Sequence, residues 1–337
     1  MKAPTAAAWA QRHQVALYLA AVAAALLVGW AVPGAPALAP AITPVLVLLL
    51  FATFLAVPFA SWGRAFTDLR FLTALLVVNF AVVPVVVLGL SRTVAGHEAL
   101  LLGVLLVLLA PCVDYVIVFT GLAGGAADRL LAAAPLLMLG QMLLLPVYLL
   151  LLAGPEAVAL VELGPFVEAF VLLILLPLAA AAIVQRAAST STAARRLESA
   201  TAAAMVPLMA LTLFAVIASQ VRGVGEQLAD LAAVVPLYAG FLAVMVAIGV
   251  LAARLARLDV PVSRALVFGG ATRNSLVVLP LALALPERLA LTPFVVVTQT
   301  LVELVGMVLL VRLVPALVRD RPPRHRGKTV PSGRERP

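Results

Sequence analysis

The sequence predicts an all-α integral membrane protein with ten transmembrane helices, arranged as two inverted five-helix repeats whose fourth and ninth helices are broken. Three observations predict this class: the composition, the number of apolar segments, and a matched pair of polar interruptions. Hydrophobic residues make up 64% of the 337 residues and charged residues 11%, against about 45–50% and about 25% in soluble domains. The mean hydropathy is +1.17, which excludes an ordinary soluble chain.

A helix needs about 20 apolar residues to cross the hydrocarbon core of a bilayer. Short connections rich in Pro, Gly and charge separate the apolar segments and leave no room for a second domain. We expect a cytoplasmic N-terminus at 1–14, one repeat at 15–152, a second at 165–314 and a disordered basic tail at 315–337. The predicted spans are 15–32, 41–60, 71–90, 99–121, 130–152, 165–184, 200–219, 231–252, 265–285 and 292–311.

The distribution of Lys and Arg sets the orientation. If the N-terminus is inside, the outer loops carry Arg92, Arg222 and Arg288, Arg273 lies within a span, and the other basic residues fall on the cytoplasmic side. An excess of Lys and Arg on the cytoplasmic side is the usual rule for membrane proteins. The sequence therefore predicts a multi-pass protein of the plasma membrane with both termini in the cytoplasm.

Two apolar segments are interrupted by polar residues at matching places. The first reads Ala110-Pro111-Cys112-Val113-Asp114-Tyr115, and the second reads Ala271-Thr272-Arg273-Asn274-Ser275. Because hydrocarbon offers no water to a broken backbone, such breaks persist only inside protein or beside a wet cavity. Interrupted segments in corresponding positions of two halves are typical of the binding site of a secondary transporter.

Further polar residues follow the same spacing. An offset of 162 residues carries Cys112 onto Asn274 and Gln141 onto Glu303. Because each half holds five spans, the second half starts on the opposite side of the membrane, as in inverted repeats built for alternating access. Any chain of ten spans can be divided into two sets of five, so the number of spans alone does not indicate a repeat. The evidence for the inverted repeat is the pair of polar positions that share one offset. They place Gln141 among the candidate site residues.

Glu303 lies deep in the last span. An ionisable group there costs about 2.5–3.5 kcal/mol on insertion scales and is functional by default; the alternative is a structural ion pair with Arg273. Gln299 lies one turn earlier on the same face, and Gly306 would allow the close approach of another helix. We expect Glu303 to bind a proton or a cation during coupling.

The first break carries a cysteine and a carboxylate. Pro111 removes a helical hydrogen bond, so the helix is expected to break at 110–112. Cys112 adjoins this break. A membrane cysteine is usually inert packing, but at a predicted site its thiolate is a soft ligand for thiophilic species. Asp114 either relays protons, as a second coupling residue, or neutralises Arg273.

The second break carries a fixed cation and small polar groups. Arg273 is the only basic residue in any predicted span, and it either holds an anionic substrate or acts as a counter-ion for the two carboxylates. Asn274 and Ser275 either satisfy open backbone groups or contact the substrate. Asn79, which precedes Pro84 in the third span, is interpreted as a capping or packing residue.

The sequence lacks the patterns of several other functional classes. One cysteine is present, so an internal disulfide is impossible and the thiol remains available. His13, His97 and His325 lack metal-ligand spacing, and no Ser–His–Asp or HExxH pattern indicates an enzyme. The net charge of +8 comes from loops and the tail rather than from a folded surface for nucleic acid. We expect no cofactor, and a small solute, protons and the lipid bilayer as partners.

These residues resemble a known family. Ten spans in two inverted halves, with broken fourth and ninth helices that cross, are similar to the bile acid:sodium symporter superfamily over residues 12–315. Within it, Ala110-Pro111-Cys112 and Leu301-Val302-Glu303-Leu304-Val305 resemble the cysteine motif and the last-helix motif of bacterial arsenite efflux permeases. The resemblance implies essential roles for Cys112 and Glu303 in extruding trivalent arsenite against protons.

The chain departs from these relatives at the two breaks. After the cysteine the permeases typically have Thr-Ala-Met, whereas this chain has Val113-Asp114-Tyr115. Their ninth span usually has an asparagine-rich, acid-containing stretch. The sodium symporters carry a glutamate and a glutamine around the ninth-helix crossover, where the comparable positions here are Gly269 or Gly270 and Arg273. Because a fixed guanidinium would repel sodium, a proton is the expected coupling ion.

Three functional hypotheses follow. The leading hypothesis is a proton-coupled efflux carrier for arsenite or a related oxyacid. In it, Cys112 is the arsenite ligand, and Glu303 and Asp114 take part in proton coupling. The residues expected around the substrate are Arg273, Asn274, Ser275 and Gln141. The second is a carrier of small organic anions in which Arg273 binds the anion. The third is a membrane sensor or scaffold without transport, for which the sequence offers no soluble signalling domain.

Overall fold

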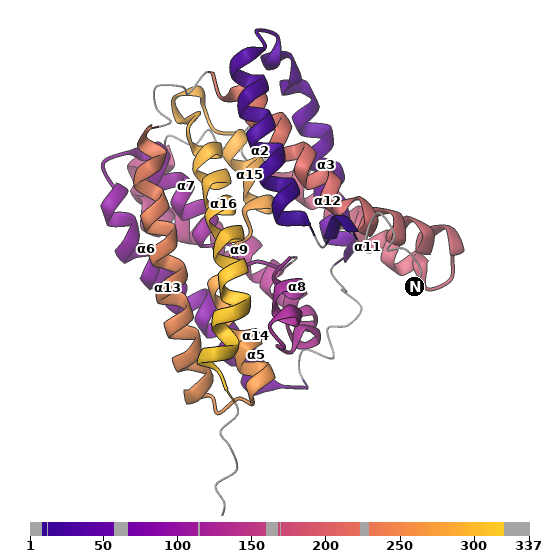
Figure 1. Cartoon of the computed structure of the whole chain (residues 1–337), viewed down its shortest axis with the longest axis vertical. Helices are drawn as coiled ribbons and strands as arrows, with labels where there is room; N and C mark the ends of the chain where they lie inside the picture. The colour runs from indigo at the N-terminus through magenta and orange to yellow at the C-terminus, as the bar shows by residue number, and fades with distance from the viewer. Residues whose placement is uncertain are drawn as a thin grey trace, which may run out of the picture.

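The computed structural model describes residues 9–11, 13–56, 67–113, 115–159, 168, 170–222 and 229–319, and these are helical apart from short connections (Figure 1). Two π-helical turns, η3 (Val78–Val82) and η5 (Val171–Leu175), lead into α6 and α11. The helices are α2 (Gln14–Ala31), α3 (Ala39–Ala56), α5 (Leu69–Val77), α6 (Val83–Ser91), α7 (Glu98–Leu108), α8 (Tyr115–Leu122), α9 (Ala127–Ala159), α11 (Leu176–Ala188), α12 (Thr192–Gln220), α13 (Leu231–Leu255), α14 (Val260–Ala271), α15 (Ser275–Leu283) and α16 (Thr292–Leu317). The 3-10 turns include η1 (Ala35–Leu38) and η7 (Glu287–Leu289).

Long apolar helices give the described part of the chain the dimensions of a multi-pass membrane protein. The prediction of an all-α membrane protein is confirmed. The predicted first span corresponds to α2, and the predicted fourth and ninth spans are each divided between two shorter helices, α7 with α8 and α14 with α15, as expected of broken spans. Seven stretches of the described residues are long and apolar enough to cross a membrane: Ala35–Ala56, Leu69–Val94, Ala127–Ala153, Val171–Ala188, Thr192–Gln220, Leu231–Leu255 and Glu287–Leu317.

The end of α16 differs from the predicted boundary. The helix continues to Leu317, beyond the predicted start of the tail at 315, because Val314 is fully buried in the core. Arg264 donates from Nε and Nη2 to the carbonyl of Val318, at 3.3 and 3.1 Å. A basic side chain on the last carbonyls stabilises a helix C-terminus. The rest of the predicted tail, 320–337, lies outside the described residues.

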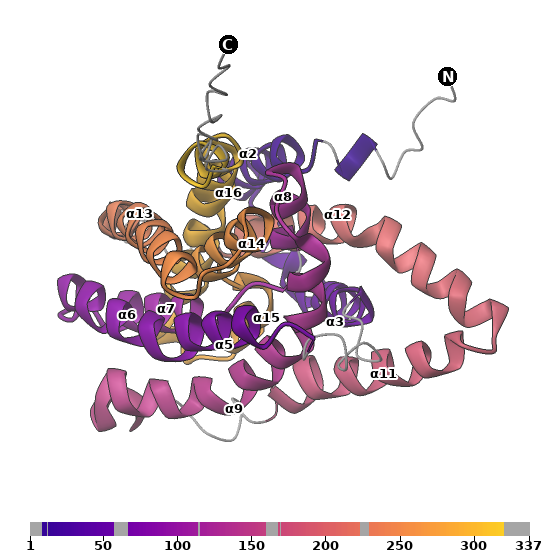
Figure 2. The ribbon, with the colours of Figure 1, turned by 90° about the horizontal axis from the view of Figure 1, so that it is seen from below.

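The helices form two groups. α2, α3, α11 and α12 pack on one another and form what we call the four-helix layer. α5 to α9 and α13 to α16 form the core bundle, in which α13 packs against both α14 and α16. In Figure 2, α11 and α12 lie on the right and α6, α7 and α13 on the left. The main contacts across the boundary join α3 to α15 and α2 to α16, so this boundary is lightly packed.

Glycines allow the closest helix contacts in both groups. A Cβ atom added at Gly103 on α7 would lie 2.6 Å from Cβ of Val295 on α16 and 3.2 Å from the carbonyl oxygen of Thr292. A Cβ atom at Gly29 on α2 would lie 2.9 Å from the carbonyl oxygen of Ala218 on α12. Small residues at such crossings are a usual way for membrane helices to pack.

We expect Gly103→Ala to destabilise the core bundle by about 1–3 kcal/mol, because an extra methyl group in a tight contact forces its neighbours to move. Gly240→Ala on α13 is the matched control, since a Cβ atom there meets nothing within 4 Å and alanine is the better helix former. Thermal unfolding of the purified chain in detergent measures both changes. Equal shifts in the two variants would contradict the contact between α7 and α16.

Candidate functional site

The two broken helices cross at their breaks. α7 ends at Leu108 and α8 begins at Tyr115, while α14 ends at Ala271 and α15 begins at Ser275. Between them, Pro111 and Arg273 form an antiparallel backbone bridge. The amide of Cys112 donates to the carbonyl of Thr272 at 3.3 Å, and the amide of Asn274 donates to the carbonyl of Ala110 at 2.7 Å. The crossing therefore satisfies backbone groups that hydrocarbon could not.

The Arg273 guanidinium is fully buried at this crossing. Its Nη2 donates to the carbonyl of Gly270 at 2.7 Å and to Oδ1 of Asn79 at 2.8 Å. Its Nη1 donates to the carbonyl of Leu108 at 3.3 Å. The guanidinium carbon lies 5.4 Å from the centre of the Phe241 ring, within the range of a cation–π contact. The side chain thus ties α7, α14, η3 and α13 together.

Two half-helix ends compensate the charge of this guanidinium. Leu108 and Gly270 lie in the last turns of α7 and α14, where carbonyls lack helical partners. Each helix C-terminus carries the equivalent of about −0.5 elementary charge. Two such ends facing one guanidinium offset much of the cost of burying it, which for an unpaired ion is several kcal/mol.

Asn79 is a part of this arrangement whose role the sequence did not indicate. Its Nδ2 donates to the carbonyl of Leu75 at 2.9 Å, so its Oδ1 is the atom left to accept from Arg273. Asn79 lies in the π-helical turn η3 and is 1% exposed. The interpretation of this residue as capping or packing is therefore incomplete: it is a direct partner of the buried cation.

Glu303 lies on the other side of the same backbone segment. Its Oε2 accepts from the backbone amide of Arg273 at 2.8 Å and from Nε2 of Gln299. The carboxylate is 1% exposed. A Cβ atom at Gly306 would lie 2.6 Å from Cδ1 of Leu242 on α13, so the expected close helix approach at this glycine is present. Arg273 thus contacts the buried Glu303 carboxylate through its backbone amide, while its own guanidinium is buried on the other side of the segment.

Asn274 and Ser275 serve the start of α15. Oδ1 of Asn274 accepts from the amide of Val277 at 3.3 Å and caps the helix, while Thr300 donates to Oγ of Ser275 at 2.7 Å. Nδ2 of Asn274 and Oε1 of Gln299 are buried without a hydrogen-bond partner among the described residues. Buried polar atoms left unpaired are rare in proteins, so these two atoms are candidates to bind a solute, a proton carrier or water.

Gln141 takes part in none of the contacts described so far. Gln141 lies on α9, is 2% exposed, and its Oε1 has no hydrogen-bond partner within the described ranges. It borders a cavity of about 20 Å³, shared with Phe170 and with Val277 on α15, which is room for about one water molecule. Asp114 lies outside the described residues.

A cavity of about 230 Å³ lies between the four-helix layer and the core bundle. Val113, the neighbour of Cys112, lines it, while Cys112 itself is fully buried. From the layer come Gln14, Tyr18, Thr53 and Met209 among others. Oγ1 of Thr53 is buried without a hydrogen-bond partner in the described structure. Sequence reasoning missed these layer residues, because only packing brings them to the break.

A second hollow lies at the opposite end of the same boundary. It holds about 570 Å³ between the end of α12 and the segment joining α15 to α16. Arg222, Arg288 and Glu287 line it together with Ser219 and Gln220. Arg222 donates from Nη2 to the carbonyl of Trp30 at the end of α2. The boundary between the two helix groups is therefore hollowed at both ends, with the crossing between them.

No curated protein matches this chain. The profile of the sodium bile acid symporter family matches residues 43–227, which is more than half of the chain and includes Asn79 and Cys112. Members of that family are membrane transporters rather than enzymes, which agrees with a multi-pass chain that has cavities between two helix groups. The chain therefore belongs to the sodium bile acid symporter family.

Proposed function

We propose that the chain is a secondary active carrier of the plasma membrane, built from ten spans in two inverted halves with both termini in the cytoplasm. The reciprocal bonds at the crossing support the repeat: the 162-residue offset exchanges Cys112 with Asn274 and Ala110 with Thr272, and so exchanges one bond for the other. Each half also gives two helices to the four-helix layer, α2 and α3 from the first and α11 and α12 from the second. Rocking of the layer against the core bundle would open the two hollows in turn.

Coupling in this proposal uses protons and not sodium. In broken-helix carriers, backbone carbonyls at half-helix ends coordinate the coupling cation. Here the carbonyls of Leu108 and Gly270 and Oδ1 of Asn79 accept hydrogen bonds from Arg273, so a permanent cation stands where a mobile one would bind. Glu303, which accepts from the amide of the same arginine, is the proposed proton carrier. Asp114 would assist it.

The proposed substrate is arsenite or a related oxyacid, moved outward. The observation that carries this proposal is the place of Cys112: its backbone is paired at the crossing, and its neighbour Val113 lines the 230 Å³ cavity. Arsenite is mostly uncharged near neutral pH, so the capture site needs a soft sulfur ligand more than a cation. Asn274, Ser275 and Gln141 would supply polar contacts around it.

We expect Cys112→Ala to reduce arsenite export at least tenfold in a host that lacks its own exporters, because it removes the soft ligand. Cys112→Ser is the matched variant, since it keeps a small side chain with a proton to donate but not the soft sulfur, and it should fail equally. Cellular arsenic content and growth under arsenite or antimonite measure the effect. Export by both variants at the parent rate would exclude a thiol-based site.

A carrier of small organic anions is the second candidate. The 570 Å³ hollow favours it, because Arg222 and Arg288 line that hollow and would attract an anion. Arg273 is less suited to clamp the anion directly, since its guanidinium donates to three protein oxygens. Carboxylate uptake into vesicles that is lost in Arg222→Gln and unaffected by Cys112→Ala would favour this candidate over arsenite.

A further inference from the structure

A large groove lies on the surface of the core bundle, and its lining residues are not those of the crossing. It has a volume of about 1000 Å³ and runs between two walls. One wall is formed by α5 and η3, with Val77, Val78 and Val82. The other wall is formed by α13, with Ile248, Leu251 and Leu255. Leu251 and Leu255 are 56% and 75% exposed. The groove is therefore a largely apolar surface open to the surroundings of the helices.

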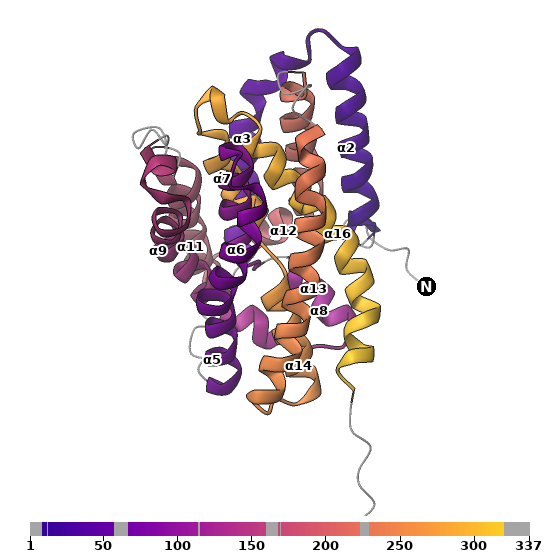
Figure 3. The ribbon, with the colours of Figure 1, turned by 90° about the vertical axis from the view of Figure 1, so that its left-hand side faces the viewer.

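α14 packs against the helices of both walls. A Cβ atom at Gly270 would lie 2.8 Å from Cγ1 of Val78, and one at Gly249 would lie 2.9 Å from Cα of Val267, so α14 packs closely against both walls. Figure 3 shows α5 and α14 together at the lower end of the molecule. α14 therefore holds the two walls in place relative to each other.

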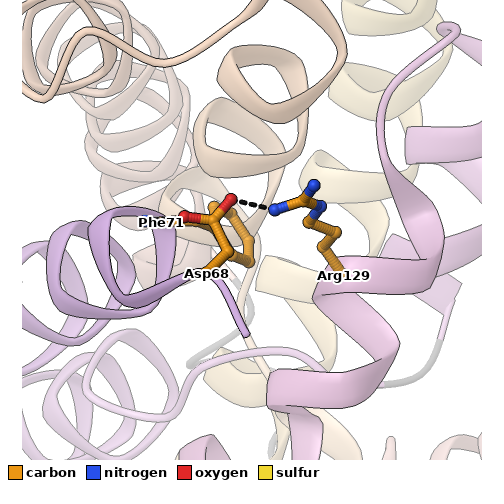
Figure 4. A network of polar contacts seen from close by, with 3 residues as sticks. All are labelled: Asp68, Phe71 and Arg129. Atoms are coloured by element: carbon orange, nitrogen blue, oxygen red, sulfur yellow. Dashed lines mark hydrogen bonds and ion pairs between the residues drawn. The ribbon is translucent and has the colours of Figure 1, made fainter. Parts of the chain in front are cut away.

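Two arginines line the groove near its polar end. The side chains of Arg70 and Arg257 are exposed and make no hydrogen bond or ion pair within the described residues. The nearby carboxylate of Asp68 is already engaged: it accepts from the amide of Phe71 at 3.1 Å and pairs with Arg129 (Figure 4). The groove therefore combines an apolar length with two arginines that have no acidic partner among the described residues.

The backbone at Arg257 also sets it apart. Arg257 has φ of 54° and is the one non-glycine residue with positive φ in the described structure. It follows the end of α13, where Leu258 donates to the carbonyl of Ala253 at 3.0 Å, the pattern of a helix terminus that usually carries glycine. An arginine is conformationally unfavourable at such a backbone angle. The chain therefore has a charged residue at a position where the backbone alone favours glycine.

We propose that this groove binds an anionic phospholipid, with its phosphate on Arg70 and Arg257 and an acyl chain between the two walls. The charge complementarity favours a lipid over a second copy of the chain. In a dimer with its twofold axis along the membrane normal, the groove of one copy would pack against the groove of the other at the same depth in the membrane. Arg70 and Arg257 of the two copies would then face each other and repel. A phospholipid brings the opposite charge and the matching apolar length together.

Such a lipid would act on the crossing as well as on stability. The wall formed by α5 and η3 carries Asn79, and the wall formed by α13 carries Phe241, and both residues contact the Arg273 guanidinium. A molecule between the walls would hold their spacing, and with it the partners of the buried cation. The lipid is thus a structural cofactor of the core bundle whatever solute the chain moves.

Native mass spectrometry of the purified full chain, with added phosphatidylglycerol or phosphatidylcholine, tests the proposal. We expect one phosphatidylglycerol to be retained preferentially and to raise the melting temperature, and soluble glycerol 3-phosphate to have no effect. Arg70→Gln with Arg257→Gln should reduce this retention at least fivefold. Arg196→Gln with Arg254→Gln removes the same charge outside the groove and should leave it unchanged.

A second variant separates the groove from its charges. Ala252→Phe places a ring among the lining residues while both arginines remain, and it should also abolish preferential retention. Retention by Ala252→Phe, equal retention of the two lipids, equal losses in the two double variants, or a dimer that buries the groove would each overturn the proposal.

Discussion

Replacing Arg273 with glutamine is expected to lower the stability of the chain by about 3–5 kcal/mol and to make that stability depend on sodium. The substitution removes the donor from the carbonyls of Leu108 and Gly270 and from Oδ1 of Asn79, while the negative ends of two half-helices remain. Sodium can occupy the vacated oxygens, and the glutamine side chain supplies one more. Sodium at about 100 times its dissociation constant would restore about 2.7 kcal/mol of the lost stability.

Thermal unfolding in sodium chloride and in choline chloride of equal ionic strength measures this effect. The parent chain should melt at the same temperature in both salts, and Arg273→Gln should melt higher in sodium. Arg264→Gln is the matched control, because Arg264 also donates to helix-end carbonyls, those of Val318 and Ala123, but is only partly buried. A sodium effect of equal size in the parent chain would refute the role of Arg273 as a built-in cation.

Replacing Glu303 with glutamine is expected to abolish transport driven by a pH gradient, with a loss of at least tenfold. An amide oxygen can still accept from the amide of Arg273 and from Gln299, as Oε2 does now, so the local structure should survive. The amide cannot exchange a proton near neutral pH, so each cycle loses its coupling step. Exchange of labelled substrate across vesicles without a gradient should persist, because it needs no net proton movement.

Glu98→Gln gives the matched control for this prediction. Glu98 is exposed at the first turn of α7, far along that helix from its broken end, so removing its charge should leave the response to pH unchanged. Gradient-driven flux in Glu303→Gln at the level of Glu98→Gln would show that the buried carboxylate does not carry the coupling proton.

The sequence indicates the crossing because polar residues are conspicuous inside apolar spans. Pro111 and Arg273 interrupt their segments, and the structure joins these two residues by a backbone bridge. Glu303 is conspicuous for the same reason, and its carboxylate contacts the backbone of Arg273. Rare polar residues in hydrocarbon must have a partner, so identifying them also identifies the region where they meet.

Other parts of the site depend on packing that residue type does not reveal. Asn79 faces Arg273 because a π-helical turn directs it there, and nothing in its apolar surroundings predicts such a turn. Thr53 and Met209 are ordinary residues for a membrane helix, and they reach the cavity only because the layer packs against α8 and the first break. Gln141, predicted from the 162-residue offset, borders its own small cavity, and its role with substrate stays a prediction.

The most direct test of the account is flux through the purified chain in proteoliposomes under separate ion gradients. Arsenite movement should follow an imposed pH gradient in the complete absence of sodium, and a sodium gradient alone should drive none. This result is expected from the buried Arg273, which donates to the oxygens of the crossing, and from the proposed exchange of protons at the neighbouring Glu303 carboxylate. Flux that requires a sodium gradient and ignores the pH gradient would contradict the account.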